Sequence, residues 1–218
     1  MRVVLVSDTH EKHGGLVVPE GDVFVHAGDF TMIGEDARVD AFNTWLGYLP
    51  HKHKIVIAGN HDRSFDIYPK EALSFGQKRL PNATYLLNTG VEIDGIKFWG
   101  SPYTPFFCSD YWKFHYDRAE GETMWAKIPE GLDFLITHGP AMKHLDMTLE
   151  GVNAGCHDLF HRIRSMVQKD VAPRYHVFGH IHEAYGRKDI GDCSVLLNVS
   201  AVDRMYRLRE NPCVVVDV

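Results

Sequence analysis

Five short polar segments of this 218-residue sequence carry side chains that bind metal ions. Each continues a short apolar run and contains aspartate, asparagine or histidine, and histidine is frequent, with 14 in the chain. This mixture of nitrogen and oxygen ligands fits manganese, iron or zinc better than calcium or magnesium, which take mainly oxygen ligands. The segments are Val6-Ser7-Asp8-Thr9-His10, Val25-His26-Ala27-Gly28-Asp29, Ile57-Ala58-Gly59-Asn60-His61-Asp62, Ile136-Thr137-His138-Gly139-Pro140 and Phe178-Gly179-His180-Ile181-His182.

The spacing within two segments suggests how side chains could share an ion. Asp8 and His10 are two residues apart, so in an extended chain both point to the same side. His180 and His182 have the same spacing, and we expect each pair to offer two ligands to one metal centre. Glycines next to the ligands, such as Gly28, would let the backbone turn sharply or approach a ligand closely.

Short β-branched runs precede the polar segments and recur along the chain. Runs of this length, bounded by Gly, Asn or Asp, are typical of buried strands. In open α/β sheets, ligands bind beyond the carboxyl ends of strands, which is where the polar segments lie. The predicted strands are Val3–Val6, Val23–Val25, Lys54–Ile57, Val91–Ile93, Ile96–Trp99, Phe134–Thr137, Tyr175–Phe178, Val195–Val199 and Cys213–Val216.

Helical patterns lie between some of these strands. Apolar residues recur every three or four positions between Val39 and Leu49, and a second apolar stripe runs from Leu159 to Val167, which predicts two amphipathic helices. Strands that alternate with helices and later come in pairs predict an α/β architecture with mixed sheets. We expect one domain over residues 1–218, because this length suits a single core.

Two further segments have distinctive patterns. Asp94-Gly95, between alternating runs, predicts a tight hairpin turn. Residues 102–112 contain two prolines and many aromatic side chains, so we predict an irregular aromatic loop. Its rings could fill core space or form a platform on which a nucleobase stacks. The candidates for contact with a substrate are Tyr103, Phe106, Phe107 and Trp112.

Composition narrows the classes of partner. The net charge of −6 disfavours nucleic acid, which is bound through clustered Lys and Arg, yet permits a small anionic substrate beside metal ions. The four cysteines form no C-x-x-C pair, which disfavours a zinc knuckle or a redox motif. The first residues lack the long apolar core of a signal peptide or membrane span. We therefore expect a cytoplasmic enzyme without a membrane partner.

Taken in order, the five segments resemble the signature blocks of the calcineurin-like metallophosphoesterase superfamily. A single block could arise by chance, but five in the family order, each after an apolar run, are specific. The resemblance implies a four-layer α/β/β/α sandwich with two mixed sheets. The matching blocks are Asp8-x-His10, Gly28-Asp29, Gly59-Asn60-His61-Asp62, Thr137-His138-Gly139-Pro140 and Gly179-His180-Ile181-His182.

Nearly the whole chain resembles one branch of this superfamily, the metallophosphoesterase-domain-containing (MPPED, 239FB-like) subfamily. That subfamily belongs to the class III cyclic nucleotide phosphodiesterases. Some mammalian members carry Gly where this chain has His180, so the resemblance implies a complete set of ligands here. The segments that match are Phe42-Asn43-x-Trp45-Leu46-Gly47, Lys54-Ile55-Val56-Ile57-Ala58-Gly59-Asn60-His61, Gly100-Ser101-Pro102-x-Thr104-Pro105 and His182-Glu183-Ala184-Tyr185-Gly186.

The resemblance also implies a role for each polar residue. Two divalent ions, manganese by preference and otherwise iron or zinc, would activate a bridging hydroxide for in-line attack on phosphorus. His61 would assist the leaving group, with Asp62 orienting it, because imidazole titrates near neutral pH. Asn60 would also contact a phosphate oxygen. The ligands divide into Asp8, His10 and His182 for one ion, Asn60, His138 and His180 for the other, and Asp29 as the bridge.

Several polar residues outside this set need a separate interpretation. His26, inside a predicted strand, is expected to be a hydrogen-bonded structural histidine. His51 and His53, which flank Lys52, are expected in a solvated turn. Arg63 could meet the substrate phosphate or lie on the surface. The segment Gly155-Cys156-His157 could bind an anion, as helix starts do, or simply begin a helix.

Three functions are compatible with these patterns. The first is a phosphodiesterase acting on cyclic nucleotides or other small phosphodiesters. The second is a phosphomonoesterase or protein phosphatase of the same superfamily, but residues 28–34 lack the arginine block that clamps phosphate in protein phosphatases. The third is a scaffold that binds nucleotides with little turnover, which the presence of His180 and His61 disfavours.

Overall fold

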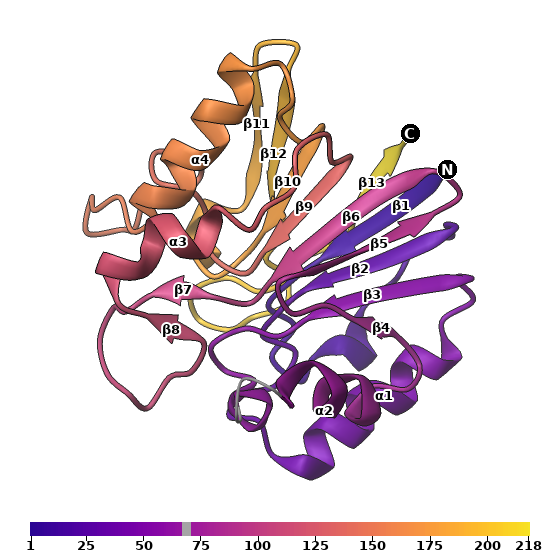
Figure 1. The fold of residues 1–218 in the computed structure, drawn as a ribbon. Coiled ribbons are helices and arrows are strands. Elements are labelled where there is room, and N and C mark those ends of the chain that lie inside the picture. Colours follow the sequence, from indigo (N-terminus) through magenta and orange to yellow (C-terminus); the bar gives the residue numbers. More distant parts are fainter. Residues whose placement is uncertain (67–70) are drawn as a thin grey trace.

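Side chains of the first strand are buried on both of its faces, so each face must be covered. Val3 and Leu5 pack in one apolar cluster and Val4 and Val6 in another, because successive strand residues point to opposite sides. In the computed structural model, which describes residues 1–66 and 71–218, one face packs on a second sheet and the other on helices (Figure 1). The predicted four-layer α/β/β/α sandwich is confirmed.

Two mixed sheets form the inner layers of the described chain. Parallel pairing joins the central strands of each sheet, and antiparallel strands lie at one edge of the first sheet and at both edges of the second. A separate parallel pair consists of β7 (Thr104–Pro105) and β8 (His115–Tyr116). In spatial order the first sheet is β13 (Val214–Asp217), β1 (Arg2–Val6), β2 (Val23–Ala27), β3 (His53–Ile57) and β4 (Thr84–Tyr85), and the second is β11 (Gly186–Ile190), β12 (Ser194–Asn198), β10 (Tyr175–Phe178), β9 (Phe134–Thr137), β6 (Ile96–Ser101) and β5 (Thr89–Ile93).

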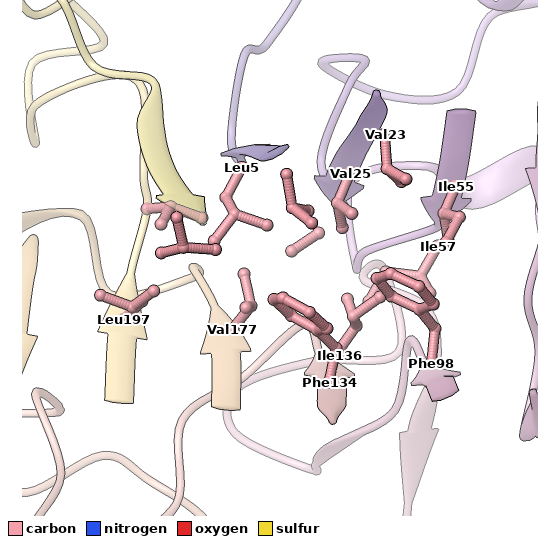
Figure 2. Packing of buried hydrophobic residues seen from close by; sticks show 14 of the residues in the cluster. Leu5, Val23, Val25, Ile55, Ile57, Phe98, Phe134, Ile136, Val177 and Leu197 are labelled. Carbon is pink, nitrogen blue, oxygen red and sulfur yellow. The ribbon is translucent and has the colours of Figure 1, made fainter. Parts of the chain in front are cut away.

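The interface between the sheets is the central apolar core. Figure 2 shows Leu5, Val25 and Ile57 of the first sheet facing Phe134 and Ile136 of the second. These five side chains have no exposed surface, and burying each stabilises the fold by roughly 1.5–3 kcal/mol. The core therefore fixes how the strand ends of one sheet lie against those of the other.

Helices cover the outer face of each sheet. Residues of α1 pack on the first sheet, and residues of α3 and α4 pack on the second. The longest helix of the described residues has 13 residues, and a span of the hydrocarbon core needs about 20, so no described helix can cross a membrane. The helices are α1 (Asp36–Tyr48), α2 (Ala72–Arg79), α3 (Gly121–Trp125) and α4 (His157–Gln168), with 3-10 turns η1 (His13–Gly15), η2 (Arg63–Phe65), η3 (Arg118–Glu120) and η4 (His182–Ala184).

Every strand and both helices predicted from the sequence are present, whereas four strands and two α-helices of the described residues were missed. The predicted hairpin joins β5 to β6, and its turn residues Asp94 and Gly95 have φ values of 48° and 84°, as a two-residue turn of type I′ requires. The missed strand β11 is polar and lies at a sheet edge, so it has no apolar run. The other missed elements are the short strands β4, β7 and β8 and the helices α2 and α3.

Two smaller predictions are wrong. His51 is not solvated but only 1% exposed, because its Nε2 bonds the carbonyl oxygen of Pro19 at 3.0 Å and its ring packs near Phe24. The segment 102–112 is not wholly irregular, since Thr104 and Pro105 form β7. By contrast, His26 is a buried structural histidine, as predicted, with Nε2 at 3.0 Å from the hydroxyl of Thr9.

Candidate metal centre

The polar segments after β1, β2, β3, β9 and β10 meet at one end of the sandwich. The strands β1, β2 and β3 run in parallel away from the edge where both termini lie (Figure 1). Backbone hydrogen bonds then join the segments, from Asp8 N to Gly28 O and from Gly179 N to His138 O, both at 2.9 Å. Ligand-type side chains from both sheets therefore converge on one location.

The described residues contain three overlapping groups of possible metal ligands. Within each group, the ligand atoms lie within 4.8 Å of one another. Every member is buried except His180, which is half-buried. Asp29 belongs to two of the groups, and so does His10. The groups are Asp8 with His10 and His182, His10 with Asp29 and His61, and Asp29 with His138 and His180.

The backbone at these residues is left-handed rather than extended. Asp8, His10, Asp29 and His180 have φ values of 51°, 40°, 56° and 68°, a conformation that costs L-residues on the order of 1–2 kcal/mol each. The expectation that residues two apart point to one side of an extended chain is therefore wrong. Asp8 and His10 still converge, but His180 turns away from His182 and joins the group of Asp29.

Two glycines are required by close approach of the ligands. A Cβ atom at Gly59 would collide with the carboxylate of Asp29 and the ring of His138. A Cβ atom at Gly179 would collide with the carboxylate of Asp8. The glycines of the sequence blocks thus leave room for the ligands, as predicted.

Asp29 lies at the centre of the cluster. Its Oδ1 accepts a hydrogen bond of 2.8 Å from the backbone N–H of His61. Its Oδ2 lies 3.2 Å from His138 Nε2, 3.9 Å from His10 Nε2 and 4.0 Å from His61 Nε2. Burial alone would raise the pKa of Asp29, but the neighbouring histidines, His138 first, hold it well below its usual value. Asp29 is therefore ionised, and its Oδ2 can interact with a positive charge on several sides.

The surroundings of His138 require a cation. Its Nδ1 lies 3.0 Å from the carbonyl oxygen of Ala27, which can only accept, so Nδ1 carries a proton. Its Nε2 faces Asn60 Oδ1 at 2.9 Å and Asp29 Oδ2 at 3.2 Å. Burial opposes the charged form of His138, but Asp29 overcomes this and raises its pKa to about 9. A proton or a metal ion must lie between this nitrogen and the two oxygens.

The group of Asp8, His10 and His182 also contains an inward-facing ring nitrogen, Nε2 of His10. Its Nδ1 lies 3.2 Å from the carbonyl oxygen of Thr31, and its Nε2 lies 3.2 Å from His182 Nε2. Burial lowers the pKa of His10 to about 4, so the ring is neutral at pH 7. Asp8 lies 3.5 Å from His182 Nε2, and this contact holds the pKa of Asp8 low although burial raises it. A metal ion fits these ligands, because the carbonyl oxygen of Thr31 already fixes the tautomer of His10 and leaves its Nε2 facing His182.

Metal affinity should therefore fall as the pH falls. A metal ion at His138 must displace the proton held with a pKa of about 9, so below that pH affinity should change about tenfold per pH unit for each proton displaced. We expect Mn²⁺ affinity, measured by calorimetry between pH 6 and 9, to rise with pH, and metal content after dialysis at about pH 5 to be low. Equal affinity across this range would contradict histidine ligation.

The ring of His61 is oriented by the backbone and not by Asp62. His61 Nδ1 lies 2.7 Å from the carbonyl oxygen of Met32, so its Nε2 is free on the side of Asp29. Asp62 instead accepts hydrogen bonds from Thr31 and from the backbone N–H groups of Gly59 and Phe30. The predicted orienting role of Asp62 is wrong, since its carboxylate ties the segments after β2 and β3 together.

Of the five predicted substrate contacts, two lie beside the cluster and three have other neighbours. The ring centre of Trp112 lies 4.2 Å from that of His61, and the exposed ring of Phe107 lies 5.2 Å from that of His180. Tyr103 instead packs edge-on to Phe114. The guanidinium of Arg63 stacks on the ring of Tyr111 at 3.9 Å. The remaining candidate, Phe106, is exposed and packs near His115.

Two residues beside the cluster were missed by sequence reasoning. The ring centre of Tyr206 lies 4.8 Å from that of His10 and 5.3 Å from that of His182. Ser200 donates a hydrogen bond of 2.7 Å to Asp8 Oδ2. Ser200 could have been found, because it follows a predicted strand as the ligands do, whereas no motif marks Tyr206. The segment Gly155-Cys156-His157 begins α4 as an ordinary helix start, capped by Cys156 Sγ.

Two mixed sheets between helices, with buried carboxylates and imidazoles at the strand ends, define a metal-dependent phosphoester hydrolase. The profile of the calcineurin-like phosphoesterase superfamily domain matches residues 1–218. This chain belongs to that superfamily.

Proteins that this chain matches over most of their length support this assignment. The chain is 39% identical over 238 residues to metallophosphoesterase domain-containing protein 1 of Homo sapiens, covering 100% of this chain and 71% of that protein. It is 35% identical to UPF0046 protein K07C11.7 of Caenorhabditis elegans, covering 98% and 74%. The fold is similar to that of TT1561 of Thermus thermophilus, with a TM-score of 0.58 and 14% identity over 95% of this chain and 96% of that chain.

Proposed function

We propose that this chain is a phosphodiesterase that hydrolyses small phosphodiesters, cyclic nucleotides among them, with two divalent metal ions. The observation that carries the proposal is the position of Asp29 in two adjacent groups of ligands, one oxygen of its carboxylate being near both His10 and His138. A shared carboxylate is what a site for two neighbouring ions needs. Superfamily membership supports the same class of reaction.

The ligands divide between the two ions as follows in this proposal. Manganese is our first choice of metal, with iron or zinc as alternatives, because imidazole and carboxylate ligands suit these borderline ions. When bound, two such ions neutralise charge on a phosphoryl group and activate water. One ion takes Asp8, His10 and His182, the other takes Asn60, His138 and His180, and Asp29 is shared.

The protein groups around the ions would position the ester. Asn60 offers an amide to a phosphate oxygen, and His61, in its doubly protonated form, donates its Nε2 proton to the leaving oxygen, since its Nδ1 proton is held by Met32. Phe107 and Trp112, next to His180 and His61, are proposed as the surfaces against which an aromatic base of the substrate stacks. Arg63 and Tyr103 have other partners and are not included in this part of the proposal.

A panel of substrates with defined metals tests the function. The untagged chain should hydrolyse bis-p-nitrophenyl phosphate and cyclic nucleotides with Mn²⁺, and faster than p-nitrophenyl phosphate. Faster cleavage of the monoester would favour a phosphomonoesterase. Calorimetric binding of AMP without cleavage of any diester would favour a nucleotide-binding scaffold, and either result would overturn the proposal.

The role of His61 can be read from the leaving group. If His61 donates a proton to the leaving oxygen, His61→Ala should slow the hydrolysis of poor leaving groups by about 10²–10⁴-fold. Esters of p-nitrophenol, which leave without a proton, should be affected much less. Rates for a series of aryl phosphodiesters should therefore depend more steeply on the pKa of the leaving phenol in the variant. An equal loss for all esters would mean that His61 acts by binding phosphate or metal instead.

A further inference from the structure

A pair of histidines lies outside the metal centre, on the exposed surface of α4. His157 and His161 are four residues apart, so they share one face of the helix. Their Nε2 atoms are 3.0 Å apart, and both residues are exposed. We propose that His157 and His161 form a separate binding site for a borderline divalent cation such as Ni²⁺ or Zn²⁺, ions for which imidazole is a favoured ligand.

A carboxylate orients one member of the pair. Asp158 Oδ1 lies 3.3 Å from His157 Nδ1. An ionised carboxylate accepts only, so His157 carries its proton on Nδ1 and turns the lone pair of Nε2 toward His161. Carboxylates hold metal-binding histidines in this way in many proteins, where they fix the tautomer and the direction of the ring. The pair is therefore arranged to bind a cation between its two Nε2 atoms.

The space around the pair can take an ion with its remaining ligands. His157 and His161 line a cavity of about 510 Å³ between α4 and α3, which lie side by side (Figure 1). Glu122 of α3 lines the same cavity, and water would complete the coordination of the ion. Among the described residues, those that line this cavity are all distinct from the ligands at the strand ends. The site would be independent of the candidate metal centre.

The start of the helix influences how the pair binds a cation. His157 is the first residue of α4, and the partial positive charge at a helix start disfavours a cation, although the carboxylate of Asp158 next to it offsets this effect. The pair can also exist without metal, with His161 Nε2–H donating to His157 Nε2. The metal-bound pair and the hydrogen-bonded pair should differ in how much metal the chain binds.

Nickel binding to the untagged full chain distinguishes them. Calorimetry with NiCl₂ should show one more equivalent bound by the wild type than by His161→Gln, which keeps a polar side chain but loses the imidazole. The matched control is Arg164→Ala, an exposed change on the same helix, which should bind as the wild type does. Asp158→Asn should weaken the site about tenfold, as expected for a carboxylate that orients a ligand histidine.

Phosphodiester turnover adds an independent readout. Because the site is separate from the strand-end ligands, His161→Gln should keep the turnover of the wild type, whatever the substrate proves to be. Equal nickel binding by the wild type, His161→Gln and Arg164→Ala would overturn the proposal and leave a hydrogen-bonded pair. Loss of nickel together with loss of turnover would also overturn it, because the pair would then belong to the catalytic centre.

Discussion

Asp29→Asn is expected to lower phosphodiester turnover by about 10²–10³-fold, the size of effect seen when one preorganised charged or dipolar group is removed from a reacting centre. The variant keeps the shape of the side chain and can still accept the 2.8 Å hydrogen bond from His61 N. It replaces the anionic oxygen near His138 and His10 by a neutral group. In the proposed site two ions share this carboxylate, and they cannot share an amide in the same way, so metal content should fall with activity.

Two measurements and one control make this result specific. Turnover of bis-p-nitrophenyl phosphate with Mn²⁺ gives the rate, and mass spectrometry of the dialysed chain gives the metal content. Asp189→Asn is the control, because Asp189 is an exposed carboxylate of β11 that pairs with Arg187 and should change neither quantity. Turnover of Asp29→Asn within tenfold of the wild type would show that Asp29 does not hold the ions together.

The meeting of the ligands at one end of the fold could be predicted from the sequence. Apolar runs such as Val3–Val6 and Phe134–Thr137 predict buried strands, and parallel strands bring their carboxyl ends to one edge. Each of these runs is followed within a few residues by Asp8 or His138. Strand prediction and the position of the polar residues were therefore sufficient to bring the candidate residues together.

The grouping of the ligands could not be predicted from residue spacing and was implied only by the family resemblance, because it depends on unfavourable backbone conformations. His180 has a φ of 68°, in a left-handed region that is uncommon for residues other than glycine. This turn places His180 with Asp29 and His138, away from His182. Sequence spacing alone assumes an extended chain, so it paired His180 with the wrong neighbour.

Contacts made by backbone atoms and by distant loops are also hidden in the sequence. The carbonyl oxygen of Met32 orients His61, but every residue has a carbonyl group, so no residue type marks this position. Tyr206 reaches His10 from a turn in which Asp203 accepts hydrogen bonds from the N–H and side chain of Arg207. The turn alone does not place Tyr206 beside His10, because that position also depends on how the two sheets pack.

The largest loss of stability is expected for Asp62→Ala. Asp62 is fully buried, and its two oxygens accept four hydrogen bonds. Oδ1 accepts from the N–H and the hydroxyl of Thr31 at 2.9 and 2.7 Å, and Oδ2 accepts from the N–H groups of Gly59 and Phe30 at 2.9 and 3.3 Å. Alanine would leave these donors buried without acceptors, which should lower the free energy of unfolding by about 3–5 kcal/mol, at roughly 1–3 kcal/mol for each unsatisfied group after partial relaxation.

Asp66→Ala is the control that distinguishes loss of the hydrogen bonds to Asp62 from the general effect of removing a nearby carboxylate. Asp66 is half-buried, and among the described residues its Oδ2 accepts a hydrogen bond of 3.2 Å from Phe114 N, the loss of which should cost about 1 kcal/mol. Urea denaturation of the metal-free chains gives both values without a contribution from bound ions. Because Asp62 joins the segment that carries Asp29 to the segment that carries Asn60 and His61, Asp62→Ala should also weaken Mn²⁺ binding, whereas Asp66→Ala should not. Similar stability losses in the two variants would show that these segments are held together mainly by packing and not by the carboxylate of Asp62.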